Sequence, residues 1–551
     1  MPKRTIEQPV TLVTQFQVPK GLEGMKLHAA GTLGAGMVTS IDPADIKDEA
    51  CQLLLNERTR FDKPSRRVGS ILATPPKPNT SAVIRLAYVA LPDGATDFDV
   101  RITPSTVHFK ALNGAWQNAT GGILHGGVTD RISDAVIILP TGPPYYVFAN
   151  NGVNEIQKVD FAGVTFGDLR AGAGVSTKYR YITGFYNRIW GFALAGVNEC
   201  QLGWSGDGNI TVFDPAVDST AGNTPLIDSP DDETDFIKGG FGFTNIMLIL
   251  RQRSIWHGTK LPIPTNPVSF YAAIPGIGCD CPYSARVTTE GIAWVDTATG
   301  TVWSYTPGKW PEPIGRPIEK SLINAIADPN LVFASYNRAN FEYTVCIAQP
   351  SSTDVLCYTY NFRNNSWVVD NQPGVTAIAD MKYGAGGLSI SQLVGTISGL
   401  QGTIQDLGKG QTFNTRLYGR QDGEILIEHP AATMDGQTSP GDTSGVAFES
   451  DIISKSFELA YADEIIAKVR IDYICQVAGN MSLWYSKSGG LDNDWILAKT
   501  ISITPSSAKK MFMFKKGIKT SRFAWKLSST LGQFDVTKYE VHYFPGAEAR
   551  T

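Results

Sequence analysis

A short phrase that recurs along the chain constrains its fold more than any other feature of the sequence. Residues 179–215 read YRYITGFYNRIWGFALAGVNECQLGWSGDGNITVFDP: an aromatic-rich strand, a turn, a second strand and then Trp-Ser-Gly-Asp-Gly. Variants of the phrase occupy residues 134–161, 235–261, 285–314 and 340–369. Short β-branched and aromatic runs that alternate with polar residues, separated by Gly, Asn and Asp, are typical of antiparallel strands and hairpin turns. The pattern predicts repeated small β-sheets.

Small sheets of this kind need neighbours, because one sheet alone cannot bury both of its faces. Radial stacking buries the faces and protects the sheet edges. The Trp-bearing strands recur at roughly 45 to 65 residues, in the upper range for propeller blades. We therefore predict an all-β chain with an irregular β-propeller of about six to eight blades over residues 81–410. An extended sandwich, or two separate β-domains, is the alternative.

The segments on either side of this region differ in composition. Residues 1–80 open with a Gly-rich stretch and are expected to form an N-terminal arm and the first strands. Residues 433–445, TMDGQTSPGDTSG, have the composition of a linker. The rest of the region 411–551 alternates apolar and polar residues, which predicts a C-terminal antiparallel β-sandwich.

Charge and hydropathy argue against two classes of partner. The chain has 48 basic and 52 acidic residues, a net charge of -4, so no electrostatic footprint for wrapping nucleic acid is visible. The longest apolar run, near residues 245–250, is far too short to span a bilayer. The first residues lack the apolar core of a signal peptide. We expect a soluble protein without a membrane span.

No motif predicts catalysis or a bound metal. None of the six histidines is followed by Glu, so no zinc-protease motif exists, and Asp207 occupies the second glycine position of a nucleophile elbow in GWSGDG. Seven scattered cysteines imply no disulfide framework. Cys279 and Cys281 form the one close pair, but a zinc site needs about four ligands, which favours buried strand cysteines. We expect no catalytic residue, no metal and no cofactor, and therefore not an enzyme.

Ser205 and Asp207 belong to a pattern that is similar to the Asp-box of sialidase-like propellers. In that box the side chains bond to their own hairpin backbone and fix a turn. We therefore predict a structural turn at Ser205 and Asp207. A sialidase-like, glycan-active propeller is the less favoured alternative, because its chemistry requires carboxylates and an arginine cluster on one face.

Taken together, several stretches resemble the tail nozzle, or tail hub, proteins of short-tailed, podovirus-like bacteriophages. The resemblance rests on NERTRFDKPSRRVG (56–69), on YNRIWGFALAG and LGWSGDGNITVFDP in the opening phrase, on GFGFTNIMLILRQRSIWHG (240–258), and on SRFAWKLSSTLGQFDVTKYEVHYFP (521–545). It spans most of the chain, although each motif is loose. Val68 departs from it, since relatives tend to have Pro before the glycine.

The resemblance implies a mechanical function in the virion. The family forms a ring, usually of six subunits, at the distal tail below the portal and adaptor proteins, near tail fibres or spikes, and DNA leaves the capsid through it without sequence-specific binding. Synthesis in the host cytoplasm and no catalytic residues are implied. A host-receptor-binding adhesin propeller is the first alternative.

An acidic segment is a candidate for a loop that faces such a channel. Its members are Asp228, Asp231, Asp232, Glu233 and Asp235. Carboxylates could also hold calcium, but the spacing of a calcium loop is missing. We therefore favour a solvated loop between blades, and we name the segment as a candidate lumen loop.

Overall fold

Strands dominate the computed structural model, as the repeated sequence phrase predicts. The structure describes residues 26–60, 63–73, 78–89, 97–111, 115–121, 131–139, 145–170, 175–227, 233–243, 245–348, 353–384, 412–429, 432–438, 444–459, 465–491 and 493–544. Strands hold 56% of these residues and helices 4%. The longest helix among them is α1 (Glu319–Ala325), beside the 3-10 turns η2 (Pro282–Ser284), η3 (Arg316–Ile318) and η4 (Pro329–Leu331). The all-β prediction is confirmed.

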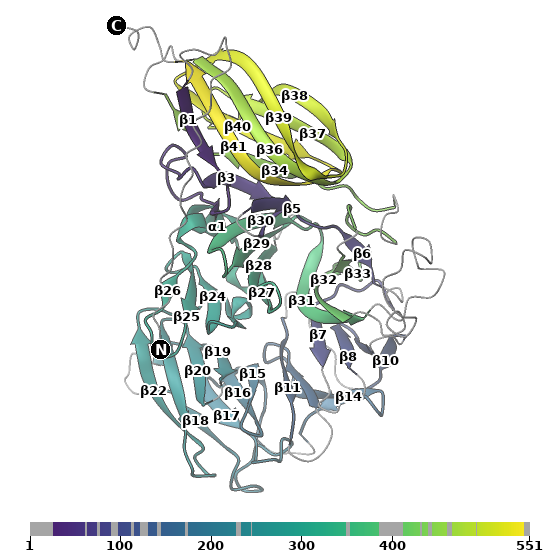
Figure 1. Ribbon diagram of the computed structural model, residues 1–551. Helices are drawn as coiled ribbons and strands as arrows, with labels where there is room; N and C mark the ends of the chain where they lie inside the picture. The colour runs from purple at the N-terminus through teal and green to yellow at the C-terminus, as the bar shows by residue number, and fades with distance from the viewer. Residues whose placement is uncertain are drawn as a thin grey trace, which may run out of the picture.

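Four-stranded antiparallel units follow one another along the chain (Figure 1). Their first strands are β7 (Arg85–Val89), β11 (Ser133–Ile137), β15 (Tyr179–Phe185), β19 (Ile237–Gly242), β23 (Arg286–Val287), β27 (Val332–Asn337) and β31 (Val375–Gly384). The strands that complete them are β8 (Phe98–Ile102), β9 (Val107–Ala111) and β10 (Gln117–Ala119); β12 (Tyr145–Ala149), β13 (Gln157–Asp160) and β14 (Thr165–Asp168); β16 (Arg188–Leu194), β17 (Asn198–Trp204) and β18 (Gly222–Pro225); β20 (Ile246–Arg251), β21 (Ser254–Lys260) and β22 (Val268–Pro275); β24 (Ile292–Asp296), β25 (Thr301–Tyr305) and β26 (Glu312–Pro313); β28 (Glu342–Ala348), β29 (Val355–Asn361) and β30 (Ser366–Asn371); and β32 (Thr412–Arg420), β33 (Ile425–Glu428) and β6 (Ser70–Leu72).

These units are the blades of a β-propeller. Six of them are separate four-stranded sheets, and the unit β27–β30 has the same strand order but continues into a larger sheet. The first strands of neighbouring units contact one another, including β11 with β15, β15 with β19, β27 with β31, and β31 with β7. The first strands therefore surround a common axis, and the last blade meets the first. The seven units counted over the described residues are within the predicted range of six to eight blades.

The recurring tryptophans explain why the sequence phrase repeats. Trp190, Trp256, Trp294 and Trp367 are each at most 1% exposed. Each belongs to a cluster that includes residues of a neighbouring blade; Trp256, for example, is grouped with Phe192 of the preceding blade. Burial of a large aromatic side chain contributes about 2–3 kcal/mol, so these strands hold the blades face to face.

The last blade is closed by a strand from near the beginning of the chain. Strand β6 pairs antiparallel with β33, and Leu72 lies opposite Leu426. The predicted domain boundary at residue 410 is therefore wrong. Strands β32 and β33, within residues 412–428, belong to the same sheet as β31 and complete a propeller blade. The predicted start of the propeller near residue 81 likewise leaves out β6.

The C-terminal strands form a sandwich, but they do not form it alone. One layer contains β39 (Ser506–Lys519), β36 (Ile465–Val477), β41 (Gln533–Phe544), β5 (Lys63–Arg66), β4 (Glu57–Arg60) and β1 (Lys26–Gly31). The other contains β3 (Ala50–Leu55), β34 (Ser450–Ser454), β40 (Arg522–Ser529), β37 (Gly479–Ser486) and β38 (Ile496–Ile503), with β2 (Gly36–Met37) and β35 (Phe457–Glu458) beside it. A shared core that includes Leu54, Val469, Trp525 and Tyr539 joins the layers.

Residues 1–80 were predicted to form an arm and the first strands; strands β1 to β6 lie in the described part of this region, and β1 is paired in the sandwich where an arm was expected. Figure 1 shows the purple N-terminal strands beside the yellow C-terminal strands of the sandwich. Strand β3 also pairs with β30 through Leu55 and Val369, so the sandwich continues into a blade. The N-terminal strands therefore connect the two domains rather than extend away from them.

The described part of the predicted linker, residues 433–438 and 444–445, packs against the propeller edge. Gln437 forms a parallel bridge with Ile71 of β6, and Asp435 pairs with Val446. The Arg67 guanidinium contacts the Asp435 carboxylate at 2.5 Å. This segment crosses between the domains as a tethered connection.

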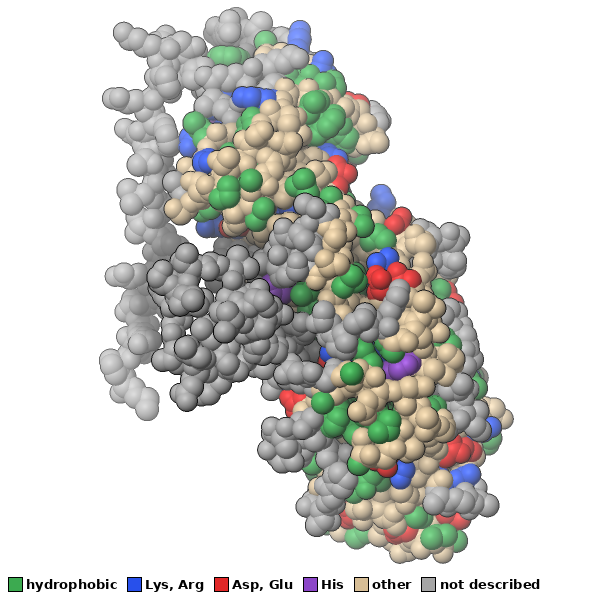
Figure 2. Space-filling view, turned by 90° about the vertical axis from the view of Figure 1, so that its right-hand side faces the viewer, with side chains coloured by type: hydrophobic (Ala, Val, Ile, Leu, Met, Phe, Trp, Pro, Cys, Tyr) green, Lys and Arg blue, Asp and Glu red, His purple; other side chains and the backbone are tan. Residues whose placement is uncertain are grey.

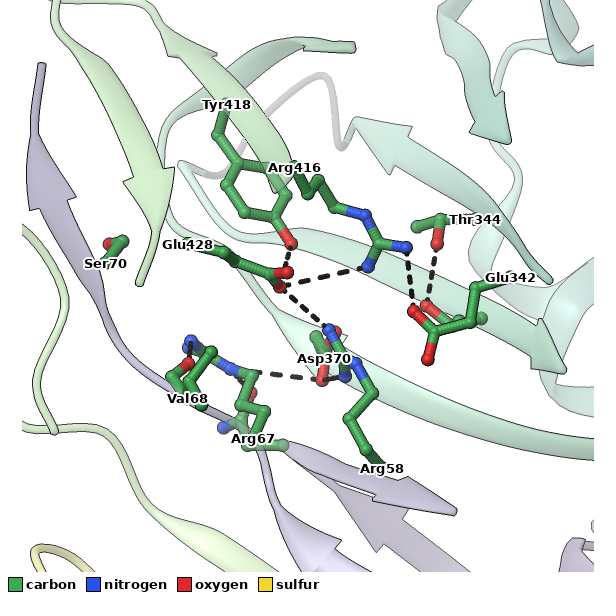
Figure 3. Close-up of polar contacts among 12 residues, drawn as sticks. Arg58, Arg67, Val68, Ser70, Glu342, Thr344, Asp370, Arg416, Tyr418 and Glu428 are labelled. Carbon is green, nitrogen blue, oxygen red and sulfur yellow. Dashed lines mark hydrogen bonds and ion pairs between the residues drawn. The ribbon is translucent and has the colours of Figure 1, made fainter. Parts of the chain in front are cut away.

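A buried network of charges lies where the sandwich, two blades and this connection meet (Figure 3). Arg416 of β32 is fully buried, and its Nη2 lies 3.2 Å from Glu342 Oε2 of β28. Arg58 of β4 contacts Asp370 of β30 at 2.7 Å and Glu428 of β33 at 3.1 Å. The network thus connects five strands, which belong to the sandwich and to two blades.

The charges in this network hold one another in their ionised forms. Burial alone would raise the pKa of Glu428, but the guanidiniums of Arg416 and Arg58 outweigh burial and hold this pKa below its usual value. The Tyr418 hydroxyl also donates to Glu428 Oε1 at 3.0 Å. Removal of any one partner leaves an uncompensated buried charge.

We predict that Arg416→Leu lowers the free energy of unfolding by about 3–5 kcal/mol, because Glu342 and Glu428 lose a buried counter-charge. The matched control is Arg522→Leu, since Arg522 pairs with Glu458 at the surface, where the side chains are 36% and 52% exposed. An exposed pair contributes at most about 1 kcal/mol. Chemical denaturation of both variants measures the difference, and equal losses would contradict the role of the network.

Candidate functional site in the axial cavity

A polar cavity of about 300 Å³ lies on the propeller axis. Its wall comes from the first strands of several blades: β7, β11, β23, β27 and β31 all contribute. The side chains with polar groups in the wall are Arg85, Tyr88, Asp134, Tyr146, Arg286, Ser335, Tyr336 and Asp380. The central position follows from the fold, because each blade presents its first strand to the axis.

Asp134 is the best-connected carboxylate in the cavity. Its Oδ1 lies 2.7 Å from Arg85 Nη2, and its Oδ2 accepts a hydrogen bond of 2.9 Å from the Tyr146 hydroxyl. The pair joins the first strands of two neighbouring blades, β7 and β11. Arg85 Nε has no hydrogen-bond partner among the described residues.

Asp380 provides a second carboxylate in a different environment. The Ser335 hydroxyl donates to it, and Arg416 Nε lies 3.9 Å away. Burial raises the pKa of Asp380 to about 6, against the opposing charge of Arg416. The cavity thus contains two carboxyl groups in different environments: Asp380, whose pKa is raised by burial, and Asp134, which is paired with Arg85.

Arginine side chains outnumber ion-paired carboxylates on the axial side of the blades. Arg131 and Arg286 form no ion pair in the part of the chain that the structure describes. The Arg286 guanidinium donates to the carbonyl oxygens of Ala334 at 2.8 Å and Ala285 at 2.7 Å. Burial, together with the charge of Arg85, lowers the pKa of Arg286 to about 10, so it stays protonated at neutral pH.

The cavity therefore has the groups that bind a hydroxyl-rich or charged small molecule. Carboxylates accept hydrogen bonds, guanidiniums and hydroxyls donate them, and aliphatic carbons of Ala135 and Ile378 complete the wall. Two carboxyl groups in different environments can also support acid–base chemistry. No group of three or more metal-binding side chains occurs among the described residues.

None of these residues was predicted from the sequence as part of a site. A signal was present: Arg85, Asp134, Lys238 and Arg286 each place a charge within the first two residues of a first strand. Charged residues that recur near the start of successive first strands are therefore a signal that the sequence contains. The convergence itself depends on ring closure, which a single repeat does not show.

Ser205 and Asp207 lie away from this cavity, at the turn that follows β17. Ser205 is fully buried, and its Oγ accepts a hydrogen bond of 3.0 Å from the Ile189 amide of the neighbouring strand. Asp207 differs: its side chain is 51% exposed and lies 3.7 Å from Arg188. Ser205 thus fixes the turn through its side chain, whereas Asp207 contributes its backbone amide, which donates to Thr220 Oγ1 at 2.9 Å.

The acidic segment does not form a described lumen loop. Asp228, Asp231 and Asp232 lie outside the described residues, and Glu233 is exposed. Asp235 is 4% exposed, and its carboxylate accepts from the Arg253 amide at 2.6 Å and from the Ser254 hydroxyl. Asp235 therefore faces the protein interior, which corrects its assignment to a lumen.

Cys279 and Cys281 are both fully buried. Burial raises the pKa of each thiol well above its usual value, and the nearby Asp280 adds to the effect. A protonated thiol is a poor metal ligand.

In the described part of the chain, no helix is long and apolar enough to cross a membrane.

On the face drawn in Figure 2, acidic, basic and hydrophobic side chains lie interspersed over the described surface. A groove that follows a nucleic acid backbone requires clustered basic residues. This face does not show such a cluster among the residues drawn in colour.

Comparisons with known proteins give structural likenesses only. No protein-family model and no curated protein matches the chain. A carbohydrate-binding module from Cellvibrio mixtus lichenase 5A, in complex with cellotriose, aligns with 18% of this chain and 80% of its own, at 11% identity and a TM-score of 0.14. An exo-beta-1,3-galactanase from Phanerochaete chrysosporium with galactose aligns with 86% of this chain and 100% of its own, at 8% identity and a TM-score of 0.23.

The expectation that the chain is not an enzyme is contradicted, and we withdraw it. The solved structure that aligns over 86% of this chain is itself an enzyme. TM-scores this low support no particular activity for this chain. Function therefore rests on the chemistry of the axial cavity.

We predict that Ser205→Ala lowers the free energy of unfolding by about 1–2 kcal/mol, because the buried Ile189 amide loses its acceptor. Asp207→Ala, at an exposed position, should change it by no more than about 0.5 kcal/mol. Thermal or chemical unfolding of the two variants measures this contrast. A larger loss for Asp207→Ala would show that its carboxylate fixes the turn after all.

Proposed function

We propose that this chain is a glycan-binding propeller whose axial cavity holds a sugar. The observation that supports the proposal is the convergence of arginine and carboxylate side chains from several blades on one cavity of about 300 Å³. A glycan-active propeller requires carboxylates and an arginine cluster on one face.

The cavity suits a sugar in three respects. Its volume is at the lower end of the usual range for small-molecule sites. The Asp134 carboxylate and the Arg85 and Arg286 guanidiniums offer acceptors and donors for several hydroxyl groups. The partners of Asp134 on two strands hold its carboxylate in place before a ligand arrives, which reduces the cost of ordering on binding.

Turnover of the bound sugar is compatible with the same cavity. Glycoside hydrolysis uses one protonated and one ionised carboxyl group. Asp380, whose pKa burial raises to about 6, and Asp134, which is paired with Arg85, are the two carboxyl groups in the cavity wall. Binding is the proposal; hydrolysis is measured alongside it.

We predict that the wild-type protein binds members of an oligosaccharide array and that Asp134→Asn weakens binding about tenfold or more, because a charged acceptor is lost. The matched control is Asp168→Asn, an exposed aspartate on β14, the outermost strand of the same blade. Release of reducing sugar from each bound glycan reports hydrolysis. Failure of the folded wild-type protein to bind any glycan would contradict the proposal, as would equal weakening by both variants.

The second candidate is the one favoured by the sequence resemblance: the distal tail nozzle of a short-tailed bacteriophage. Its support is the set of stretches at residues 56–69, 240–258 and 521–545, together with a propeller joined to a C-terminal sandwich. In this proposal, subunits form a closed ring, six in number, around a DNA channel, with adaptor and fibre proteins as partners. Closed rings need two different complementary patches on each subunit.

Electron microscopy of virions that contain the protein tests this second candidate. The expected result is an axial ring of six copies with a central pore. Side appendages off the tail axis would contradict the conduit and favour the host-receptor-binding adhesin. That adhesin function is compatible with a glycan-binding cavity.

A further inference from the structure

Two cations beside the axial cavity, the buried Arg131 and the half-buried Arg286, form no ion pair with the described residues. Arg131 is 4% exposed; its Nη1 donates to the Thr376 carbonyl, its guanidinium lies 4.2 Å over the Phe333 ring, and its Nε has no partner among the described residues. Arg286 bonds only to neutral carbonyl oxygens in the described region. A buried charge with incomplete compensation is costly. The Asp134 carboxylate, which raises the pKa of Arg286, is already paired with Arg85, so the three arginines together favour an additional anion.

A small space lies between these side chains. A cavity of about 20 Å³ has Arg85, Arg131 and Arg286 in its wall. This volume is enough for one water molecule or one carboxylate oxygen. Arg85, Arg286 and Ile378 also line the cavity of about 300 Å³, so the two spaces lie next to each other.

The local charge balance favours an anionic ligand. Of the three guanidiniums around the small space, only Arg85 has a carboxylate partner, Asp134, in the described residues. Asp380 cannot neutralise the others, because it is engaged with Ser335 and Arg416. Burial, together with the charge of Arg85, lowers the pKa of Arg131 and of Arg286 to about 10, while the Asp134 carboxylate opposes this shift at Arg286.

We propose that the ligand of the axial cavity is an acidic sugar, one carboxylate oxygen of which occupies the small space between Arg131 and Arg286 while the rest of the sugar lies in the larger cavity. This inference rests on the proposed glycan-binding function and adds the ligand class. Guanidinium groups bind carboxylates with paired, charge-assisted hydrogen bonds, which neutral hydroxyl groups cannot replace. The carboxylate thus sets specificity, and Asp134 accepts from the hydroxyl groups of the same sugar.

The experiment compares each acidic oligosaccharide with its own methyl ester. The array contains uronic-acid and sialic-acid oligosaccharides, the same oligosaccharides as methyl esters, and neutral glycans; inorganic sulfate and phosphate are titrated separately. The variants are Arg286→Met and Arg131→Met. Arg363→Met is the matched control, because Arg363 is exposed and lies 4.3 Å over the Phe341 ring, away from the cavity.

The expected result is binding of one or more acids about tenfold or more above the corresponding esters, with that preference lost in Arg286→Met and Arg131→Met but kept in Arg363→Met. Thermal unfolding verifies that each variant is folded, and either cavity variant alone is sufficient for the test. Equal binding of acids and esters would overturn the acidic-sugar inference and leave glycan binding intact. Equal affinity for inorganic sulfate or phosphate would also overturn it. Absence of binding to every glycan would overturn the proposed function itself.

Discussion

The buried charge network around Arg416 is the interaction on which the rest of the structure depends. It joins β4 of the sandwich, β28 and β30 of one blade, and β32 and β33 of the last blade. Strand pairing alone would leave these units connected through few contacts, such as the single pair between Leu55 and Val369. Because Arg416 and Arg58 share Glu428, displacement of any one strand leaves an unpaired charge in a low-dielectric interior.

The same network reaches the axial cavity. Arg416 lies 3.2 Å from Glu342 on one side and 3.9 Å from Asp380 on the other. The position and the charge of Asp380 are therefore set by groups that also close the ring. The cavity is built on rigid inner strands rather than on loops, which favours a preformed binding site.

Local features of the chain were predictable from the sequence, whereas its long-range pairings were not. The repeated aromatic strands predicted a propeller because each Trp must be buried against a neighbouring blade, as Trp256 and Trp294 are. Strand β6, with only Ser70, Ile71 and Leu72, carries no signal that it completes a blade some 350 residues later in the chain. The placement of Arg85 beside Asp134 likewise depends on the curvature of the closed ring, which cannot be predicted from any single segment of the sequence.

The central claim is that the axial cavity, lined by Arg85, Asp134, Arg286 and Asp380, is the ligand site. The most direct measurement is an experimental structure of the protein after incubation with a mixture of acidic oligosaccharides. The account predicts density for a sugar in the cavity of about 300 Å³, with its carboxylate between Arg131 and Arg286. Sugar density confined to the outer edges of the blades or to the sandwich, with the axial cavity containing only water, would contradict it.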